Sequence, residues 1–419
     1  SARIGGAALA IATQIILARI SGADALGIFF LALSLATILS IVSSLGYPWI
    51  AAPIVAQFEG AGEMSRLAAF VSWAKREIVV ASLVLAGLAA ATVWLMPGLS
   101  EESRLGLTIG ILSAPIFAIM RLHGALANAS KRFVLAFLPE LFLRPLFVFG
   151  FVCLAWAAAW PLAVPTLILA NLGIAAVLAV AQAARLRAKN RPDRKTINRA
   201  KKQLSKEGKR RLWRRQALPM IIATLFIGVF ADLDIVIVGF LFSEEDIAVF
   251  GAALKISMFL AFYIQAVHQV ILRDAATALQ GDDHLTLSKI IGRANIINIL
   301  ASIAALIGTI VLGKFVLGLF GPEFVRGYEC LVILVMAQLV RRAAGPAIHL
   351  MTIAGETRAG VPIVALGVAL LAVANFLFIP RLGVMGGAVA VLLVTVVWTV
   401  SLSLIAKVRT SVNVATIRL

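Results

Sequence analysis

Charged residues are scarce in this 419-residue sequence, since Asp, Glu, Lys and Arg together make up 14% of it. Hydrophobic residues make up 61%, and the mean hydropathy is +1.01. A soluble globular domain carries about 25% charged residues, so the scarcity of charge argues against that class. The apolar residues gather in runs of about twenty, the length that crosses a bilayer as a helix. The sequence therefore predicts an all-α, polytopic membrane protein.

Cysteine and histidine are also few, with two Cys and four His. Cys153 lies in an apolar run and Cys330 lies near the end of one, which favours neither a disulfide framework nor a metal site. The histidines show no metal-ligand spacing, and no pair of carboxylates stands out beside a Ser or His nucleophile. We therefore expect no enzyme activity, no catalytic residue and no bound metal. The only small cofactor we consider is a coupling H⁺ or Na⁺.

The positive charge is concentrated in residues 185–215, which hold 15 Lys or Arg against two acids. Bases stay on the cytoplasmic side of a membrane protein, because moving them across the bilayer is costly. Nucleic acid is not an expected partner, because the rest of the chain belongs in a membrane. Two interpretations stay open. The segment is a solvated loop, or it is an amphipathic helix whose Ile197, Leu204 and Trp213 enter the inner leaflet while its bases attract anionic lipids.

Apolar runs bounded by charge, Gly or Pro predict twelve membrane spans. They lie near residues 4–20, 26–47, 73–96, 104–124, 134–158, 161–184, 216–241, 247–272, 290–318, 328–353, 361–380 and 382–406. An even count places both termini in the cytoplasm together with the basic segment. The loops and termini assigned to the inside hold 29 of the 38 Lys and Arg, and the outside loops hold five. We expect a six-helix bundle at 1–184, a basic linker at 185–215 and a second six-helix bundle at 216–419.

The two halves also resemble each other at a shift of about 220 residues. Gly27-Ile28-Phe29 aligns with Ala248-Val249-Phe250, and the loop at 60–67 aligns with 280–287. Six spans in each half make the repeats parallel. That arrangement is typical of transporters whose substrate site lies in a central cavity at the interface of the repeats.

Three stretches resemble a known family. ILARISGADALGIFFLALS (16–34) is similar to the opening "aRxxG…yGxy" segment of O-antigen and polysaccharide-unit flippases in the multidrug/oligosaccharidyl-lipid/polysaccharide (MOP) exporter superfamily. Residues 231–257 resemble that family's seventh and eighth spans, with Ala248 and Phe250 where Gly and Tyr are usual, and LPELFLRPLF (138–147) resembles its fifth span. The resemblance implies a bacterial inner-membrane flippase. Its substrate would be undecaprenyl-pyrophosphate-linked oligosaccharide, and its partners would include the bilayer and other polysaccharide-assembly proteins.

Basic residues within spans are candidate ligands for a diphosphate. Arg341 and Arg342 lie 13 and 14 residues into the tenth span, about 20 Å deep at the rise of a helix. Guanidinium groups pair with phosphate oxygens through two parallel hydrogen bonds. Lys255 and Arg273 share one face of the eighth span and predict a path toward the cytoplasm. The alternative for the arginine pair is structural: one pairs with an acid on another helix and the other reaches the inner interface.

The acids within spans have either a structural role or a functional one. Asp232 and Asp234 of the seventh span are candidates for pairing with Lys255 or Arg341, or for binding a coupling ion. Glu140 and Arg144 stand four residues apart in the order that favours a helical ion pair. The alternative is that Arg144 faces the cavity of the N-terminal half.

The interfaces of the membrane are the expected place of four tryptophans, Trp94, Trp156, Trp160 and Trp398.

The site that these patterns predict is basic, which favours an anionic substrate. A MATE-like drug or cation antiporter is the alternative, because twelve spans fit both, and a membrane-embedded polymerase or ligase comes third because the external loops are short. Peptidoglycan-precursor flippases of the superfamily usually have fourteen spans, so the count of twelve argues against them.

Overall fold

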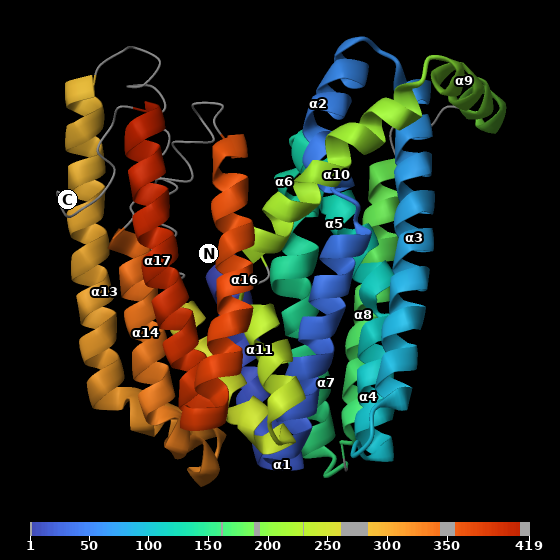
Figure 1. Cartoon of the computed structure of the whole chain (residues 1–419). Coiled ribbons are helices and arrows are strands. Elements are labelled where there is room, and N and C mark those ends of the chain that lie inside the picture. The colour runs from blue at the N-terminus through green and yellow to red at the C-terminus, as the bar shows by residue number, and fades with distance from the viewer. Residues whose placement is uncertain are drawn as a thin grey trace. The chain divides into compact units, whose positions relative to one another are not determined.

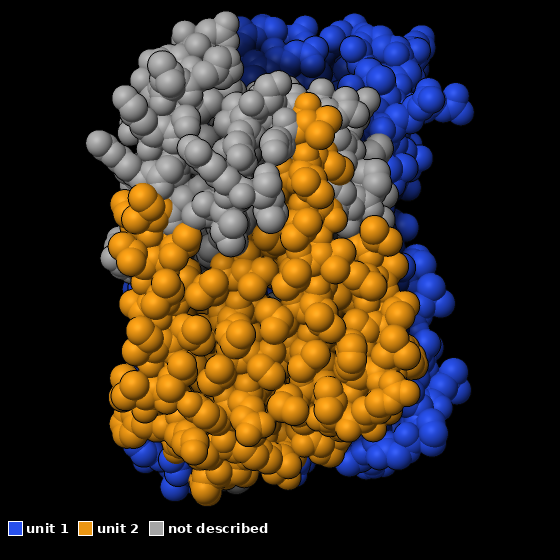
Figure 2. Space-filling view, turned by 60° about the vertical axis from the view of Figure 1, so that its left-hand side comes forward, with its two compact units in different colours: residues 1–236 blue, residues 237–419 orange. Residues whose placement is uncertain are grey.

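The computed structural model describes residues 2–160, 162–187, 193–228, 230–260, 284–343 and 357–410. Every regular element in those residues is helical (Figure 1). Packing between helices divides the chain into two units, Ser1–Val236 and Ile237–Leu419, which Figure 2 shows in different colours.

The first unit begins with a long apolar helix and ends within α11. Its helices are α1 (Ala2–Ser43), α2 (Tyr47–Gly60), α3 (Met64–Leu95), α4 (Glu101–Leu112), α5 (Ala114–Ala129), α6 (Phe133–Leu138), the π-turn η1 (Pro139–Leu143), α7 (Arg144–Ala157), α8 (Val164–Arg187), α9 (Arg194–Lys206), α10 (Lys209–Gly228) and α11 (Phe230–Leu241).

Two glycines divide the start of the chain. Gly22 has a φ of 84° and a ψ of 175° inside α1, so α1 contains two helices joined at a kink. These are the first two predicted spans. Gly46, with a φ of 73°, separates the second of them from α2. A residue with a Cβ is disfavoured at such a positive φ, which is why both bends fall on glycine.

Helix α3 shows how the first unit meets lipid. It runs for 32 residues, about 48 Å, and a bilayer core of about 30 Å leaves a substantial part of it outside the hydrocarbon. Val80, Leu83, Val84 and Leu88 are all more than half exposed on it. Such a stripe of exposed aliphatic side chains is costly in water and expected against acyl chains.

The second unit repeats the order of the first. It contains a helix over residues 244–260, α13 (His284–Phe320), the 3₁₀ turn η2 (Pro322–Gly327), α14 (Tyr328–Ala343), α16 (Thr357–Leu382) and α17 (Val384–Thr410). Helix α17 packs against α16 and α14, and α14 packs against α13. The starts of α3 and α13 are 220 residues apart, and so are those of α8 and α17. This spacing confirms a repeat at the predicted shift of about 220 residues.

Seven described stretches are long and apolar enough to cross a membrane. The helical structure and these apolar stretches confirm the predicted class, an all-α polytopic membrane protein. One boundary moves in a way that matters. The fourth span continues from Glu101 to Ala129 across α4 and α5, whereas the apolar run predicts an end at residue 124. Arg121 therefore lies inside the span rather than at its edge.

The basic segment is helical, as the second interpretation of its sequence predicts, but its apolar side chains pack on protein. Its described residues form α9 and the start of α10, so it is not a solvated loop. Leu204 and Trp213 are buried in a core shared with α2, α3 and α5, and Ile197 packs against that core. The Trp213 ring makes an edge contact with Phe70 at 5.0 Å between centroids. The apolar face of this helical segment therefore covers protein instead of entering the leaflet.

Contacts of the basic segment place it with the first unit. Arg66 Nη2 lies 3.0 Å from Glu207 Oε1, and Lys201 Nζ donates to Ser72 Oγ at 2.7 Å. The segment and the start of α3 thus share one end of the unit (Figure 1). The division of the structure falls at Val236, after the segment. The expected bundles at 1–184 and 216–419, with a separate linker between them, stay a prediction.

Candidate functional site

Two arginines lie together within the spans of the first unit. The Arg144 Cζ lies 4.8 Å from the centroid of the Phe117 ring. Arg121 Nε donates to Ser40 Oγ at 3.2 Å, and Arg121 is near enough to Arg144 for their charges to repel each other. Both side chains are half-buried. Within the described residues neither guanidinium has a carboxylate within ion-pair distance, and Glu140 acts on Arg144 only at longer range, so two positive charges here face one negative charge.

The π-turn places Arg144 at this position. Residues Pro139–Leu143 form η1, one wider turn between α6 and α7. Gly6 of α1 packs against this turn so closely that a Cβ on it would overlap the Leu141 carbonyl oxygen. Turns of this kind interrupt the regular side-chain register of a helix. Arg144 therefore begins α7 directed toward Phe117 of α5.

The ion pair predicted between Glu140 and Arg144 does not form in the described structure. The prediction assumed α-helical geometry, in which residues four apart share a face, and η1 breaks that geometry. Glu140 still attracts Arg144 at longer range. Sequence reasoning missed Arg121, because the apolar run appeared to end three residues after it. The signal that could have found it is the helix-forming sequence that continues through Ala129.

The two aspartates of α11 occupy different surroundings. Asp232 accepts a hydrogen bond from Ser34 Oγ of α1 at 3.0 Å. Asp234 is only 1% exposed. Their predicted pairing with Lys255 or Arg341 stays a prediction, as does a role in ion coupling.

Arg341 stacks on an aromatic ring in the second unit. Its Cζ lies 5.0 Å from the ring centroid of Trp398, where α14 meets α17. A guanidinium over an indole face gains a cation–π interaction. Trp398 is 6% exposed, so its predicted place in an interfacial belt is wrong, whereas Trp94, Trp156 and Trp160 are exposed as expected. The alternative in which Arg341 pairs with an acid finds no support among the described residues.

The other predicted basic residues are placed only in part. Lys255 lies half-buried in the helix over residues 244–260. The backbone of Arg342 belongs to α14, but its side chain lies outside the described residues, and so does the whole of Arg273.

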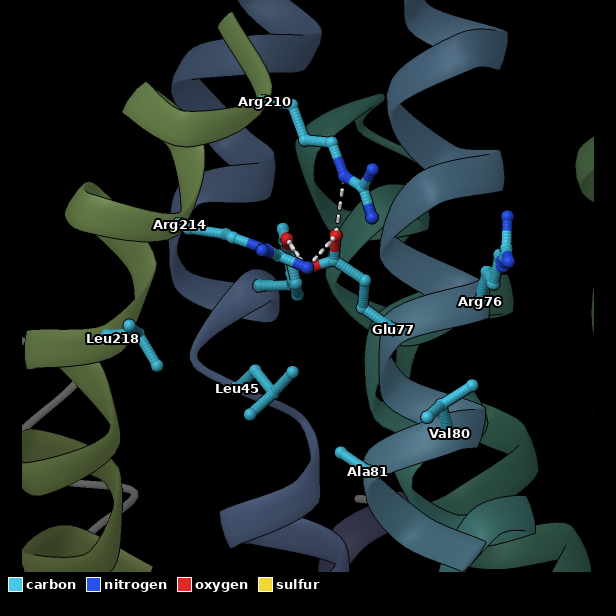
Figure 3. A pocket seen from close by; sticks show the side chains of 9 residues that line it. Leu45, Arg76, Glu77, Val80, Ala81, Arg210, Arg214 and Leu218 are labelled. Carbon is cyan, nitrogen blue, oxygen red and sulfur yellow. Dashed lines mark hydrogen bonds and ion pairs between the residues drawn. The ribbon is translucent and has the colours of Figure 1, made fainter.

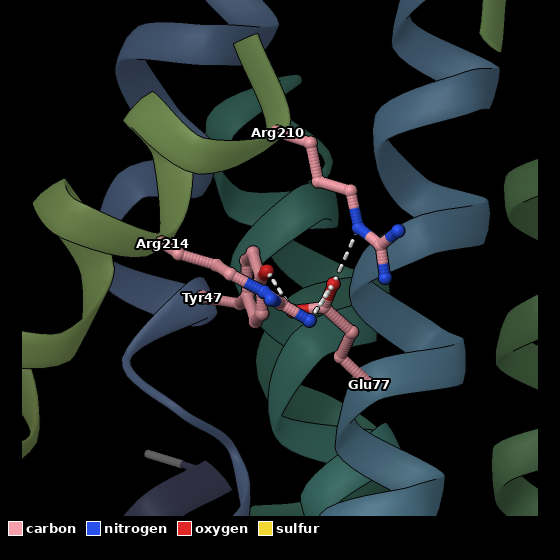
Figure 4. A network of polar contacts seen from close by, with 4 residues as sticks. All are labelled: Tyr47, Glu77, Arg210 and Arg214. Atoms are coloured by element: carbon pink, nitrogen blue, oxygen red, sulfur yellow. Dashed lines mark hydrogen bonds and ion pairs between the residues drawn. The ribbon is translucent and has the colours of Figure 1, made fainter. Parts of the chain in front are cut away.

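A polar network that the sequence did not predict lies where α2, α3 and α10 meet (Figure 4). Glu77 of α3 is 7% exposed, and its carboxylate receives four hydrogen bonds. Arg214 donates to both oxygens at 2.8 Å, Arg210 Nε donates to Oε1 at 2.9 Å, and Tyr47 donates to Oε2 at 2.5 Å. These bonds raise the pKa of Arg214. The buried carboxylate is thus fully paired, as a buried charge requires.

The network forms one wall of a pocket of about 480 Å³ (Figure 3). Its upper part is basic and its lower part is apolar. The lining residues are Leu45, Tyr47, Arg76, Glu77, Val80, Ala81, Arg210, Arg214 and Leu218. Within the described residues no group of three or more His, Cys, Asp and Glu could hold a metal ion.

No protein-family model matches the sequence. No curated protein matches it either. Solved structures do match, along nearly the whole chain. An inward-facing multidrug resistance MATE family transporter of the MOP superfamily superposes with a TM-score of 0.76 at 14% identity, over 97% of this chain and 94% of that one. The chain has the fold of the MOP transporters.

Two further structures give the same result. The lipid II flippase MurJ in an inward closed conformation has a TM-score of 0.72 at 14% identity, with 97% of this chain and 86% of MurJ covered. A MOP superfamily transporter from Pyrococcus furiosus, described as having a binding pocket of reverse polarity, has a TM-score of 0.60 at 15% identity, with 97% and 95% covered. The MOP fold and the apolar helices together make this chain a multi-pass membrane protein, and its structural neighbours are transporters and flippases.

Proposed function

We propose that this protein is a flippase for undecaprenyl-pyrophosphate-linked oligosaccharide. It moves the lipid-linked sugar from the cytoplasmic to the outer leaflet of a bacterial inner membrane by alternating access. Arg341 and Arg342, helped by Lys255, hold the diphosphate, with Arg144 and Arg273 along its path. The isoprenoid tail stays in lipid throughout. One of the three structures described above, MurJ, is described as a lipid II flippase, which supports a lipid-linked substrate.

The observation that carries the proposal is the arginine pair in the first unit. Arg121 and Arg144 are half-buried in spans and have no carboxylate partner among the described residues. A charge within a membrane span is costly and marks a substrate or ion pathway. Glu140 supplies one negative charge at longer range, so the pair keeps a net positive charge, which a diphosphate balances through guanidinium forks. A cation would be repelled from this place.

A second candidate function is a multidrug or cation antiporter. The observation that favours it is Asp234, whose buried carboxylate in α11 is the kind of group that binds a coupling ion or an organic cation. The structural match with the MATE transporter has the highest TM-score of the three described above. The two candidates differ in the sign of the substrate's charge.

Transport by purified protein in proteoliposomes separates the candidates. The substrate is a polyprenyl-diphosphate oligosaccharide placed in one leaflet, and its arrival in the other is measured with a membrane-impermeant glycosidase. Each lost charge-assisted hydrogen bond costs about 1.5–3 kcal/mol, so Arg144→Ala and Arg341→Ala should lower the apparent affinity about 10- to 150-fold. Arg144→Lys keeps the charge and should recover part of the loss.

The matched control is Arg211→Ala, which removes the same charge from an exposed position on α10. It should transport as the unmodified protein does. The proposal fails if Arg144→Ala and Arg341→Ala both transport the glycolipid normally at matched incorporation. Uptake of an organic cation against a proton gradient, abolished by Asp234→Asn, would instead establish the antiporter.

A further inference from the structure

The pocket between α2, α3 and α10 lies at the level of lipid headgroups. A helix crosses the hydrocarbon core in about 20 residues, and counting back from Leu95 at the far end of α3 reaches Arg76 and Glu77. Below them, Val80 and Leu83 are more than half exposed, as expected against acyl chains. The pocket therefore sits at the interface on the end of the unit that carries the basic segment. The positive-inside rule assigns that end to the cytoplasm.

The charge of the pocket wall is positive. Three arginines are among its lining residues, Arg76, Arg210 and Arg214, against the single carboxylate of Glu77. The carboxylate is buried, and its hydrogen bonds all come from Tyr47, Arg210 and Arg214 in the same wall. Three positive charges less one negative charge leave a net charge of +2 on the lining residues. An anion placed there meets excess positive charge and no free acid.

The geometry leaves hydrogen-bond donors for such an anion. Arg210 donates to Glu77 through Nε alone, so its two terminal amino groups take no part in the bonds to Glu77. The side chains of Arg210 and Arg214 are 41% and 51% exposed, although both form ion pairs with Glu77. Arg76 stands at the rim on α3, with its guanidinium turned away from Glu77 (Figure 3). Held arginines are preorganised, so less side-chain entropy is lost when they bind a phosphate.

The lower wall is suited to an acyl chain. Leu45, Val80, Ala81 and Leu218 line it without a polar group. Val80 and Leu218 are 55% and 49% exposed. A ligand with a phosphate above and a hydrocarbon chain below would satisfy both walls, whereas free phosphate would leave the apolar wall uncovered. Basic pockets of this kind between helices on the cytoplasmic side bind anionic headgroups.

We propose that this pocket is a binding site for an anionic glycerophospholipid of the inner leaflet. Arg210 and Arg214 hold the phosphate of the headgroup, Arg76 adds positive charge at the rim, and one acyl chain runs along Val80 and Leu218. Glu77 positions the two arginines of α10 and does not itself contact the lipid. The site belongs to the first unit alone and does not depend on what the protein transports.

Native mass spectrometry of the detergent-purified full chain tests the site with phosphatidylglycerol as the probe. Phosphatidylcholine with the same acyl chains and inorganic phosphate are the comparison ligands. We expect one phosphatidylglycerol to bind in preference to both. Each base near an anionic headgroup contributes about 1 kcal/mol, so Arg76→Gln should weaken binding about fivefold. Arg210→Gln also removes the exposed donors and should weaken it about tenfold or more.

The matched control is Arg211→Gln, which makes the same charge change one residue away on an exposed position outside the pocket. It should leave the preference for phosphatidylglycerol unchanged. Arg76 makes no bond to Glu77, so Arg76→Gln remains informative if Arg210→Gln disturbs folding. Equal binding of phosphatidylglycerol by Arg76→Gln, Arg210→Gln and Arg211→Gln would overturn the proposal. So would equal binding of the two phospholipids by the unmodified protein, or competition by inorganic phosphate as effective as that by phosphatidylglycerol.

Discussion

Replacement of Gly46 by alanine should destabilise the first unit for two separable reasons. The first is conformational, because Gly46 has a φ of 73° and a left-handed conformation costs a residue with a Cβ about 1–2 kcal/mol. The second is steric, since an added Cβ would lie 1.9 Å from the Ala217 carbonyl oxygen of α10. Such overlap with backbone forces a helix to move, at a cost of about 1–3 kcal/mol. The sum is about 2–5 kcal/mol.

Gly62 offers a matched control for this substitution. Its φ is 71°, close to that of Gly46, but a Cβ on it would meet nothing within 4 Å. Gly62→Ala should therefore lower the stability only by the conformational cost of about 1–2 kcal/mol. The difference in stability between the two variants therefore measures the steric cost of the close approach between Gly46 and α10.

The assay is heating of each purified variant in detergent, followed by size-exclusion chromatography of the protein that stays folded. Gly46→Ala should lose its folded peak at the lowest temperature, Gly62→Ala at an intermediate one and the unmodified protein at the highest. Equal losses for the two glycine variants would refute the reasoning, because they would show that α10 does not constrain Gly46. A Gly46→Ala protein as stable as the unmodified one would refute both parts.

Three other predictions concern two polar contacts and the orientation in the membrane. Tyr47→Phe removes a hydrogen bond to the buried Glu77 carboxylate and should lower the stability by about 1.5–3 kcal/mol. An unchanged melting temperature in the same heating assay would show that this hydrogen bond does not stabilise the protein. In intact cells an impermeant thiol reagent should label Ser243→Cys and spare Ser205→Cys, and the reverse pattern would contradict the orientation. Arg326→Ala breaks ion pairs of half-exposed groups and should change the stability by less than about 1 kcal/mol, whereas a large loss would contradict that estimate.

The sequence alone determined the class and the repeat. These depend on the length of apolar runs and on their spacing, which are local properties of the chain. A helix in a membrane satisfies its backbone hydrogen bonds internally, so a run of about twenty apolar residues has few alternatives. The shift of about 220 residues between similar segments likewise reappears as the shift between helix starts.

The neighbours of individual charges were decided by tertiary structure. The pairing predicted for Glu140 and Arg144 applied a rule for α-helices at a place where a π-turn replaces the α-helix. Arg121 became part of the site because its helix continues past the end of the apolar run.

The basic segment shows the same limit most clearly. The pattern of Ile197, Leu204 and Trp213 predicts an amphipathic face, but lipid and a protein core accept the same side chains. The packing of α9 and α10 against α2, α3 and α5 decided between them. In the sequence, Glu77 is a single acid within the long α3. It became the centre of a pocket only because the fold brings Tyr47, Arg210 and Arg214 to it, and burial makes each of those hydrogen bonds necessary.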